Sequence, residues 1–268
     1  MDPKVWREMG LTDSEYKKIQ ESAYLEEVQN YPMDTLNMPD DYNEVLLKLL
    51  ASPNIASKEY AYRQENAVCP TPTIGMVGLV EDLDKVCTQS FKQEGDAIFL
   101  IGENLPELGG SEYLKVQFKL ETGKPPALHL DLEKKVQDFV LQEIQSGLIK
   151  SAHDCSEGGL AVALAESCIT GGIGADITLV RKFRGDALLF GETQSRIIIS
   201  IDSNRGVELV KKLVDAGVPY TQMGKTGGEA LIINVVNPGC TGCGGNLVNL
   251  PVTRLEEAWR GAIPCLMK

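Results

Sequence analysis

Apolar runs typical of strands alternate with helical patterns from about residue 68 onward, and this alternation limits the possible folds more than any other feature. The helical pattern is clearest between Leu132 and Leu148, where apolar residues form one stripe. Shorter helical patterns lie near residues 159–171, 206–216 and 254–259. Strand-like runs lie at residues 74–80, 97–102, 175–179, 196–201 and 230–236. The mixture predicts an α+β fold built of packed layers.

The first 64 residues have a different character. A capping-box spacing at residues 12–15 predicts one helix, and prolines at positions 32 and 39 indicate an extended linker. Asp41 is placed to cap a further helix over residues 45–50, which Pro53 prevents from continuing. We therefore divide the chain into a helical leader and linker, residues 1–64, and a layered domain, residues 65–268.

Composition excludes several classes of function. The chain has 268 residues and a net charge of −12, which disfavours nucleic-acid binding through a basic surface. No apolar run approaches the roughly 18–20 residues that span a bilayer, and the N-terminus lacks an apolar signal core. The seven cysteines are odd in number and scattered, which is typical of reduced thiols. These features predict a cytoplasmic protein that binds neither membranes nor nucleic acids.

Three glycine-containing segments are candidates for a binding site. In the first, Gly109 and Gly110 allow a tight turn, and Ser111 adds a hydroxyl donor beside exposed amides. Such a turn can bind phosphate. An ordinary structural turn is the alternative.

The second segment, residues 151–159, lies between an expected strand and a helix start. It holds His153, one of two histidines in the chain, and Asp154, whose carboxylate is a suitable Mg²⁺ ligand. Unpaired amides at the start of a helix also favour an anion. The alternative is that Asp154 or Ser156 only caps the helix and His153 satisfies a buried carbonyl group.

The third segment, residues 190–196, precedes an isoleucine-rich run. Gln194 can donate hydrogen bonds to a ligand, and Arg196 can pair with a phosphate group. A solvent-facing entry to a strand is the alternative here.

Together these segments resemble the synthetase subunit of the phosphoribosylformylglycinamidine synthase family. The resemblance runs collinearly over some 200 residues. It is carried by residues 70–82 (PTPTIGMVGLVED), 91–96 (FKQEGD), 109–112 (GGSE), 153–159 (HDCSEGG), 191–196 (GETQSR) and 255–264 (LEEAWRGAIP). It implies the fold of the C-terminal domain of AIR synthase-related proteins.

The leader resembles the same family in two separated pieces. Residues 6–16 are similar to the start of the family's subunit, and residues 42–58 are similar to a segment near its middle. Two internal blocks of that subunit, including the segment with its catalytic histidine, have no counterpart here. The resemblance thus implies apolar surface left uncovered by missing domains, and with it self-association.

The resemblance also implies an activity, an ATP-dependent C–N ligase of purine biosynthesis that uses Mg²⁺. It implies two partners, a glutaminase subunit and a small accessory subunit. Asp154 matches the family's metal-binding aspartate, and Glu192 and Gln194 lie in its substrate-contacting segment. With Gly109, Gly110, Ser111 and Arg196, these residues form the expected nucleotide and phosphate site. No catalytic residue is expected in this chain, and a non-catalytic nucleotide-binding or partner-docking domain remains the alternative function.

Overall fold

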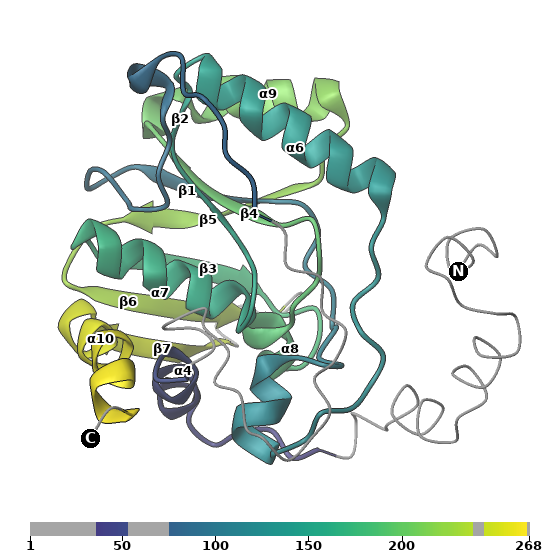
Figure 1. Ribbon diagram of the computed structural model, residues 1–268, viewed down its shortest axis with the longest axis vertical. Coiled ribbons are helices and arrows are strands. Elements are labelled where there is room, and N and C mark those ends of the chain that lie inside the picture. The colour runs from purple at the N-terminus through teal and green to yellow at the C-terminus, as the bar shows by residue number, and fades with distance from the viewer. Residues whose placement is uncertain (1–35, 53–74, 238–243, 267–268) are drawn as a thin grey trace, which may run out of the picture.

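The computed structural model describes residues 36–52, 75–237 and 244–266, with side chains up to residue 262 (Figure 1). The seven strands of this part form one sheet in the order β2-β4-β1-β5-β3-β6-β7. Neighbouring strands are antiparallel except for β3 and β6, which are parallel. The strands are β1 (Ala97–Ile101), β2 (Ile149–Asp154), β3 (Ala175–Val180), β4 (Ile197–Ile201), β5 (Tyr220–Thr226), β6 (Ala230–Val236) and β7 (Gly244–Pro251).

Helices cover the sheet in two groups (Figure 1). One group lies beside β2, β4 and β1 and consists of α6 (Leu130–Gln145) and α9 (Gly206–Ala216). The other lies toward β3, β6 and β7 and consists of α4 (Tyr42–Leu50), α7 (Gly159–Gly171), α8 (Gly185–Phe190) and α10 (Val252–Leu266). Short turns of helix occur at Leu83–Lys85 (η2), Leu114–Phe118 (η3) and Ser203–Arg205 (η4). The α+β prediction is confirmed.

The two helical groups enclose two hydrophobic cores. Strand β1 serves both, because alternate side chains point to opposite faces of the sheet. Phe99 packs in the core under α6 and α9, whereas Ile98 and Leu100 pack in the core around α7. All five residues of β1 are buried, as expected for a central strand with both faces covered.

The helix α4 confirms the expectation of a short helix capped by Asp41, whose side chain accepts a hydrogen bond from the Asn43 amide at 2.8 Å. Its apolar face, including Leu46 and Leu49, is buried in the same core as α7. The described part of the leader thus shares the core of the layered domain. The leader helix expected from residues 12–15 lies outside the described residues.

The prediction of a strand at residues 74–80 was wrong for the described part of that range, residues 75–80. Residues 75–80 form no strand, and the side chains of Met76, Val77 and Leu79 are almost fully exposed. A strand needs a neighbour to satisfy its backbone groups, and none of the described residues pairs with this segment. The nearest pairing is a single bridge from Thr88 to Ser151 at the edge of β2.

In the part of the chain that the structure covers, we find no helix with the length and apolar character needed to cross a bilayer.

Candidate functional site

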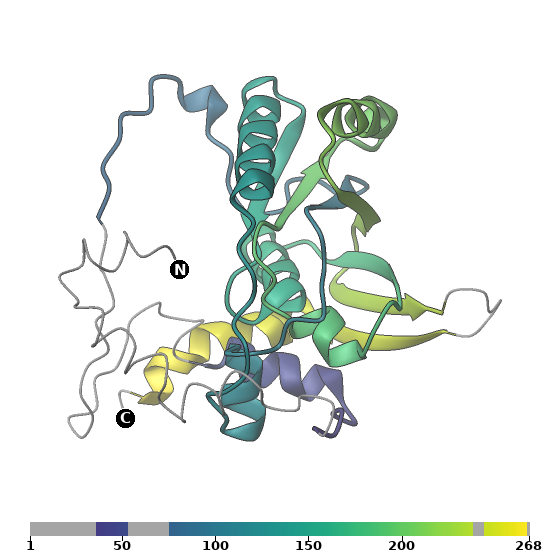
Figure 2. The ribbon, with the colours of Figure 1, turned by 90° about the vertical axis from the view of Figure 1, so that its right-hand side faces the viewer.

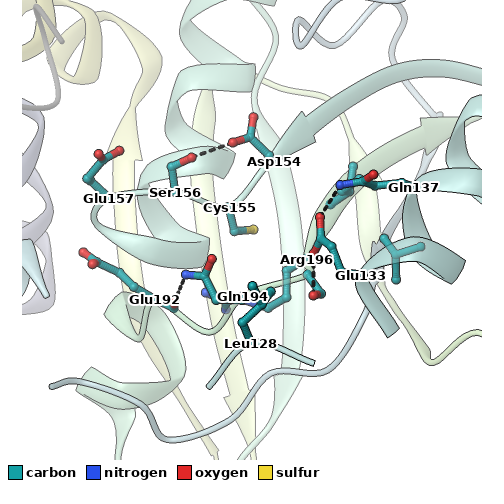
Figure 3. A pocket seen from close by; sticks show the side chains of 13 residues that line it. Leu128, Glu133, Gln137, Asp154, Cys155, Ser156, Glu157, Glu192, Gln194 and Arg196 are labelled. Atoms are coloured by element: carbon teal, nitrogen blue, oxygen red, sulfur yellow. Dashed lines mark hydrogen bonds between the residues drawn. The ribbon is translucent and has the colours of Figure 1, made fainter. Parts of the chain in front are cut away.

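A cavity of about 700 Å³ lies between the end of β2, the start of β4 and the first turns of α6 (Figure 3). In Figure 3, Asp154 and Ser156 stand on one wall, with Glu133 and Gln137 of α6 across from them. Two of the three segments predicted from the sequence contribute to it. The lining residues are Leu128, Glu133, Val136, Gln137, Asp154, Cys155, Ser156, Glu157, Glu192, Gln194, Ser195, Arg196 and Ile197.

The close approach of two backbones shapes one wall. Gly159, the first residue of α7, has φ +68°, and a Cβ placed on it would lie 2.3 Å from the Gly191 carbonyl oxygen. Only glycine combines this left-handed backbone with so little space. The loop that carries Glu192 and Gln194 can therefore rest directly on the start of α7.

Glu192 joins all three segments. Its Oε1 accepts hydrogen bonds from the amide of Gly158 at 2.7 Å and from the amide of Glu112 at 2.9 Å. The GGSE turn, the start of α7 and the loop before β4 thus meet at one carboxylate. Burial raises the pKa of Glu192 to about 7, even though both amides favour the charged form. The Gly158 amide, at the start of α7, therefore donates to Glu192 and not to an external anion, as the sequence had suggested.

His153 and Asp154 form a charged pair at the end of β2. His153 Nε2 lies 2.9 Å from Glu166 Oε2, and its Nδ1 lies 3.6 Å from Asp154 Oδ1. Burial opposes the charged ring, but polar contacts with Asp154 and Glu166 outweigh it and raise the pKa of His153 to about 9. Contact with the His153 ring, and a hydrogen bond from Ser156, hold the pKa of Asp154 well below its usual range. Asp154 is therefore a carboxylate at any physiological pH.

Arg196 is in the wall of the cavity, but its hydrogen bonds are internal. The side chain is 2% exposed. It donates from Nε to the Thr193 carbonyl oxygen at 2.8 Å, from Nη1 to Asn104 Oδ1 at 2.7 Å and from Nη2 to the Gly191 carbonyl oxygen at 2.6 Å. The guanidinium group thereby fixes the loop that presents Gln194.

The turn at Gly109, Gly110 and Ser111 does not line the cavity. The Gly110 amide donates to the Thr122 carbonyl oxygen at 2.8 Å, and Ser111 Oγ donates to the Leu108 carbonyl oxygen at 2.6 Å. Its link to the site is the amide of Glu112. Gln194 is exposed and bonds only the backbone of Glu192, at 3.2 Å, among the contacts recorded for it.

Sequence reasoning missed the contribution of α6. Glu133 and Gln137 line the cavity, and Ser195 Oγ donates a hydrogen bond to Glu133 Oε2. Their spacing of four residues places both on one helical face, at the edge of the apolar stripe and in line with Val140. That spacing was the available signal.

The lining is acidic. Glu133, Asp154, Glu157 and Glu192 line the cavity, and the only cation among the lining residues is the internally bonded Arg196. The described residues contain no group of three or more side chains arranged as a metal cage. Asp154 offers a single carboxylate, 72% exposed. Mg²⁺ is commonly held by one or two carboxylates together with a substrate phosphate, and this donor set fits that mode.

Comparison with known proteins identifies the family. The family model described as AIR synthase related protein, C-terminal domain, matches residues 93–235, just over half of the chain. The chain belongs to this family. The matched AIR synthase related region runs from just before β1 to the end of β6 and contains all three glycine-containing segments.

Curated relatives confirm the resemblance seen in the sequence. Phosphoribosylformylglycinamidine synthase subunit PurL of Caldanaerobacter subterraneus subsp. tengcongensis is 45% identical over 76% of this chain. The subunit of the same name from Moorella thermoacetica is 42% identical over 84% of this chain. The chain spans only 27% and 29% of these two relatives.

A solved structure, Thermotoga maritima PurL complexed with FGAR, matches with a TM-score of 0.55 and 17% sequence identity. The match covers 65% of this chain and 30% of that one. At this identity the likeness shows a shared fold. The AIR synthase related domain is therefore established, and the activity of the longer relatives is a separate question.

Proposed function

We propose that this chain is the nucleotide- and cation-binding part of a cytoplasmic purine-biosynthesis ligase of the phosphoribosylformylglycinamidine synthase type. The observation that carries the proposal is Asp154, a permanently charged and exposed carboxylate at the mouth of a 700 Å³ cavity beside the start of α7. Support for the type of ligase comes from the PurL relatives.

Asp154 is the residue proposed to hold Mg²⁺. When bound, the ion supplies positive charge that neutralises phosphate oxygens. A phosphate group without a cation would meet four acidic side chains in this cavity and no available cationic side chain among the lining residues. Binding of ATP to this site should therefore require the divalent ion.

The other site residues have graded roles in this proposal. Gln194 is exposed at the cavity and contacts the nucleotide directly. Glu192 and Arg196 hold the loop that presents it, through the bonds described above. Gly109, Gly110 and Ser111 act from behind, by fixing the turn whose Glu112 amide binds Glu192.

Turnover is proposed to need more than this chain, because the chain spans under a third of its PurL relatives. The relatives are named as subunits, which supports an assembly with other chains. Following the family resemblance, we propose a glutaminase subunit that supplies ammonia and a small accessory subunit. A non-catalytic domain that only binds nucleotide is the second candidate, and the closed bonding of Arg196 favours it.

Two measurements test this function. Isothermal titration calorimetry of ATP with Mg²⁺ should show binding that disappears with EDTA and weakens at least tenfold in Asp154→Asn. Asp138→Asn, on the exposed side of α6, is the matched control and should bind as the parent does. Equal affinity in the Asp154→Asn variant would contradict the proposed cation site.

Phosphate release from ATP, with formylglycinamide ribonucleotide, ammonia and Mg²⁺, separates the two candidates. A full-length PurL relative serves as the positive control. Substrate-dependent release by this chain alone would show that the residues it lacks are dispensable. Binding without release would favour the nucleotide-binding role, with catalysis completed by other chains.

A further inference from the structure

A second cavity, of about 970 Å³, shares no lining residue with the acidic site. It is formed by β1, β3 and β5 with α8 and α9, and we call it the apolar groove. Its lining includes Leu100, Leu179, Val180, Leu188, Val214 and Met223. Val180 and Val214 are 47% and 64% exposed, so the groove opens to solvent along an apolar edge.

The same chain exposes an apolar segment with no place to pack. Residues 75–86, which we call the arm, include Met76, Val77, Leu79, Val80 and Leu83, each more than 60% exposed. Val77 and Leu79 are about as exposed as in an extended peptide, at 103% and 98%. Single exposed apolar residues are ordinary, but a run of five marks an interaction site.

In the described structure, the arm is attached to the rest of the domain only near its C-terminal end. The η2 turn at Leu83–Lys85 is tied to α6, because Lys85 Nζ donates to the Gln145 carbonyl oxygen at 2.8 Å. Residues 75–80 make no strand pairing with the described chain. Figure 2 shows this segment, in blue, standing away from the body on the side opposite α9, whose green helix borders the groove. The arm therefore cannot fill the groove of its own chain in this arrangement.

We propose that the arm of a second copy of this chain occupies the apolar groove. The two surfaces match in character, since both are apolar, open and without a recorded partner in the described chain. The arm carries Glu81, Asp82 and Asp84, and the groove lining holds one basic side chain, Lys182, and one acidic side chain, Glu103. Lys182 is exposed and has no recorded ion pair in the described residues.

Reciprocal exchange follows from the presence of both surfaces on every copy. If each arm enters the groove of the other copy, two identical contacts form and the assembly closes as a dimer. Each contact removes large apolar side chains from water, which favours association.

Sedimentation equilibrium over a range of chain concentrations tests the proposal. The parent chain should be a concentration-dependent dimer, and the double variant Val77→Asp with Leu79→Asp should weaken association at least tenfold. These side chains touch almost nothing in the monomer, so circular dichroism should show an unchanged fold. A parent chain that stays monomeric at high concentration, or a double variant that associates equally well, would overturn the proposal.

Two substitutions on α9, one inside the groove and one outside it, test the groove side of the contact. Val214→Lys places a charge in the groove and should also disrupt the dimer at least tenfold. Val207→Lys is the control, because Val207 is 86% exposed on the same helix and outside the groove lining. Equal effects of the two substitutions would count against the groove as the contact.

A labelled peptide of residues 75–86 completes the test. It should bind the double arm variant, whose groove is intact, and should fail to bind when Val214→Lys is added. A scrambled peptide of the same composition should not bind. Binding that is insensitive to Val214→Lys would show that the arm docks elsewhere, for example on a different protein surface.

Discussion

The acidic site and the arm are opposite outcomes of similar sequence signals. Both were singled out by short motifs that resemble the same family. At the site, glycine-rich loops close on one another, and Glu192 and Arg196 satisfy their polar groups within the chain. In the arm, the side chains of Val77 and Leu79 remain in water.

The difference shows where each motif finds its partners. The site motifs bind groups from the same domain, so they are ordered without any further chain. The arm has the composition of a buried strand but no neighbour among the described residues to pair with. The site should therefore respond to substitution by losing stability, whereas the arm should respond by losing association.

Arg196→Leu should give the largest loss of stability. It leaves the buried carbonyl oxygens of Thr193 and Gly191 and the half-buried Oδ1 of Asn104 without their donor. We expect the free energy of unfolding, measured with urea, to fall by about 3–5 kcal/mol. Arg254→Leu is the control, because Arg254 is exposed and makes only a surface ion pair. Similar losses of unfolding free energy for the two variants would contradict the view that Arg196 stabilises the site more than an exposed arginine stabilises the surface.

Gly159→Ala should follow, with a loss of about 2–4 kcal/mol. Its positive φ and the Gly191 carbonyl oxygen 2.3 Å from the added Cβ both oppose alanine. Gly172→Ala separates these causes. Gly172 also has a positive φ, +66°, but nothing lies within 4 Å of its Cβ position. Thermal unfolding should show a smaller loss for Gly172→Ala, of about 1 kcal/mol.

The pH dependence of stability should be smaller and specific to the site. The folded pKa of Glu192 is about 7, above the ordinary value of 4.5, so the folded chain binds the extra proton more tightly. Its stability therefore falls as the pH rises from about 4.5 to about 7, by about 1–3 kcal/mol. Glu192→Gln keeps an acceptor oxygen for the Gly158 and Glu112 amides and removes the ionisation. Urea unfolding of this variant should lack the fall in that window.

His153 provides the control in a second window. Its folded pKa of about 9 exceeds the ordinary 6.5, so its contribution to stability is fully present below pH 6.5 and is lost as the pH rises through 9. His153→Gln should remove this second fall and leave the first one unchanged. A single substitution that abolished both would show that the two groups titrate as one unit.

The elements of the fold that depend on local pattern could be predicted from the sequence. The cap at Asp41, the apolar stripe of α6 and the end of α7 at Gly171 and Gly172 all follow from residues within a turn or two of each other. The order of the strands in the sheet did not follow, because pairing joins residues far apart in the chain.

The same limit applies to the site. The three segments could be named, but not the carboxylate that joins them, since Glu192 binds amides 34 and 80 positions away. The local pattern of Arg196 suggested a phosphate ligand, and only the fold shows its three donors turned inward. The described part of the apolar run, residues 75–80, forms no strand for the opposite reason. Its local pattern is that of a strand, but none of the described residues pairs with it.

Leu79→Ala should have the smallest effect on stability, within about 0.5 kcal/mol in dilute solution where the chain is monomeric. Leu179→Ala is the matched substitution in β3, where the side chain is 5% exposed and packs in the core around α7. It should cost about 2–5 kcal/mol, because it leaves a cavity among packed side chains. If Leu79→Ala destabilised the monomer comparably, the arm would pack against its own chain in solution, and the groove of a second copy would no longer be needed to explain its sequence.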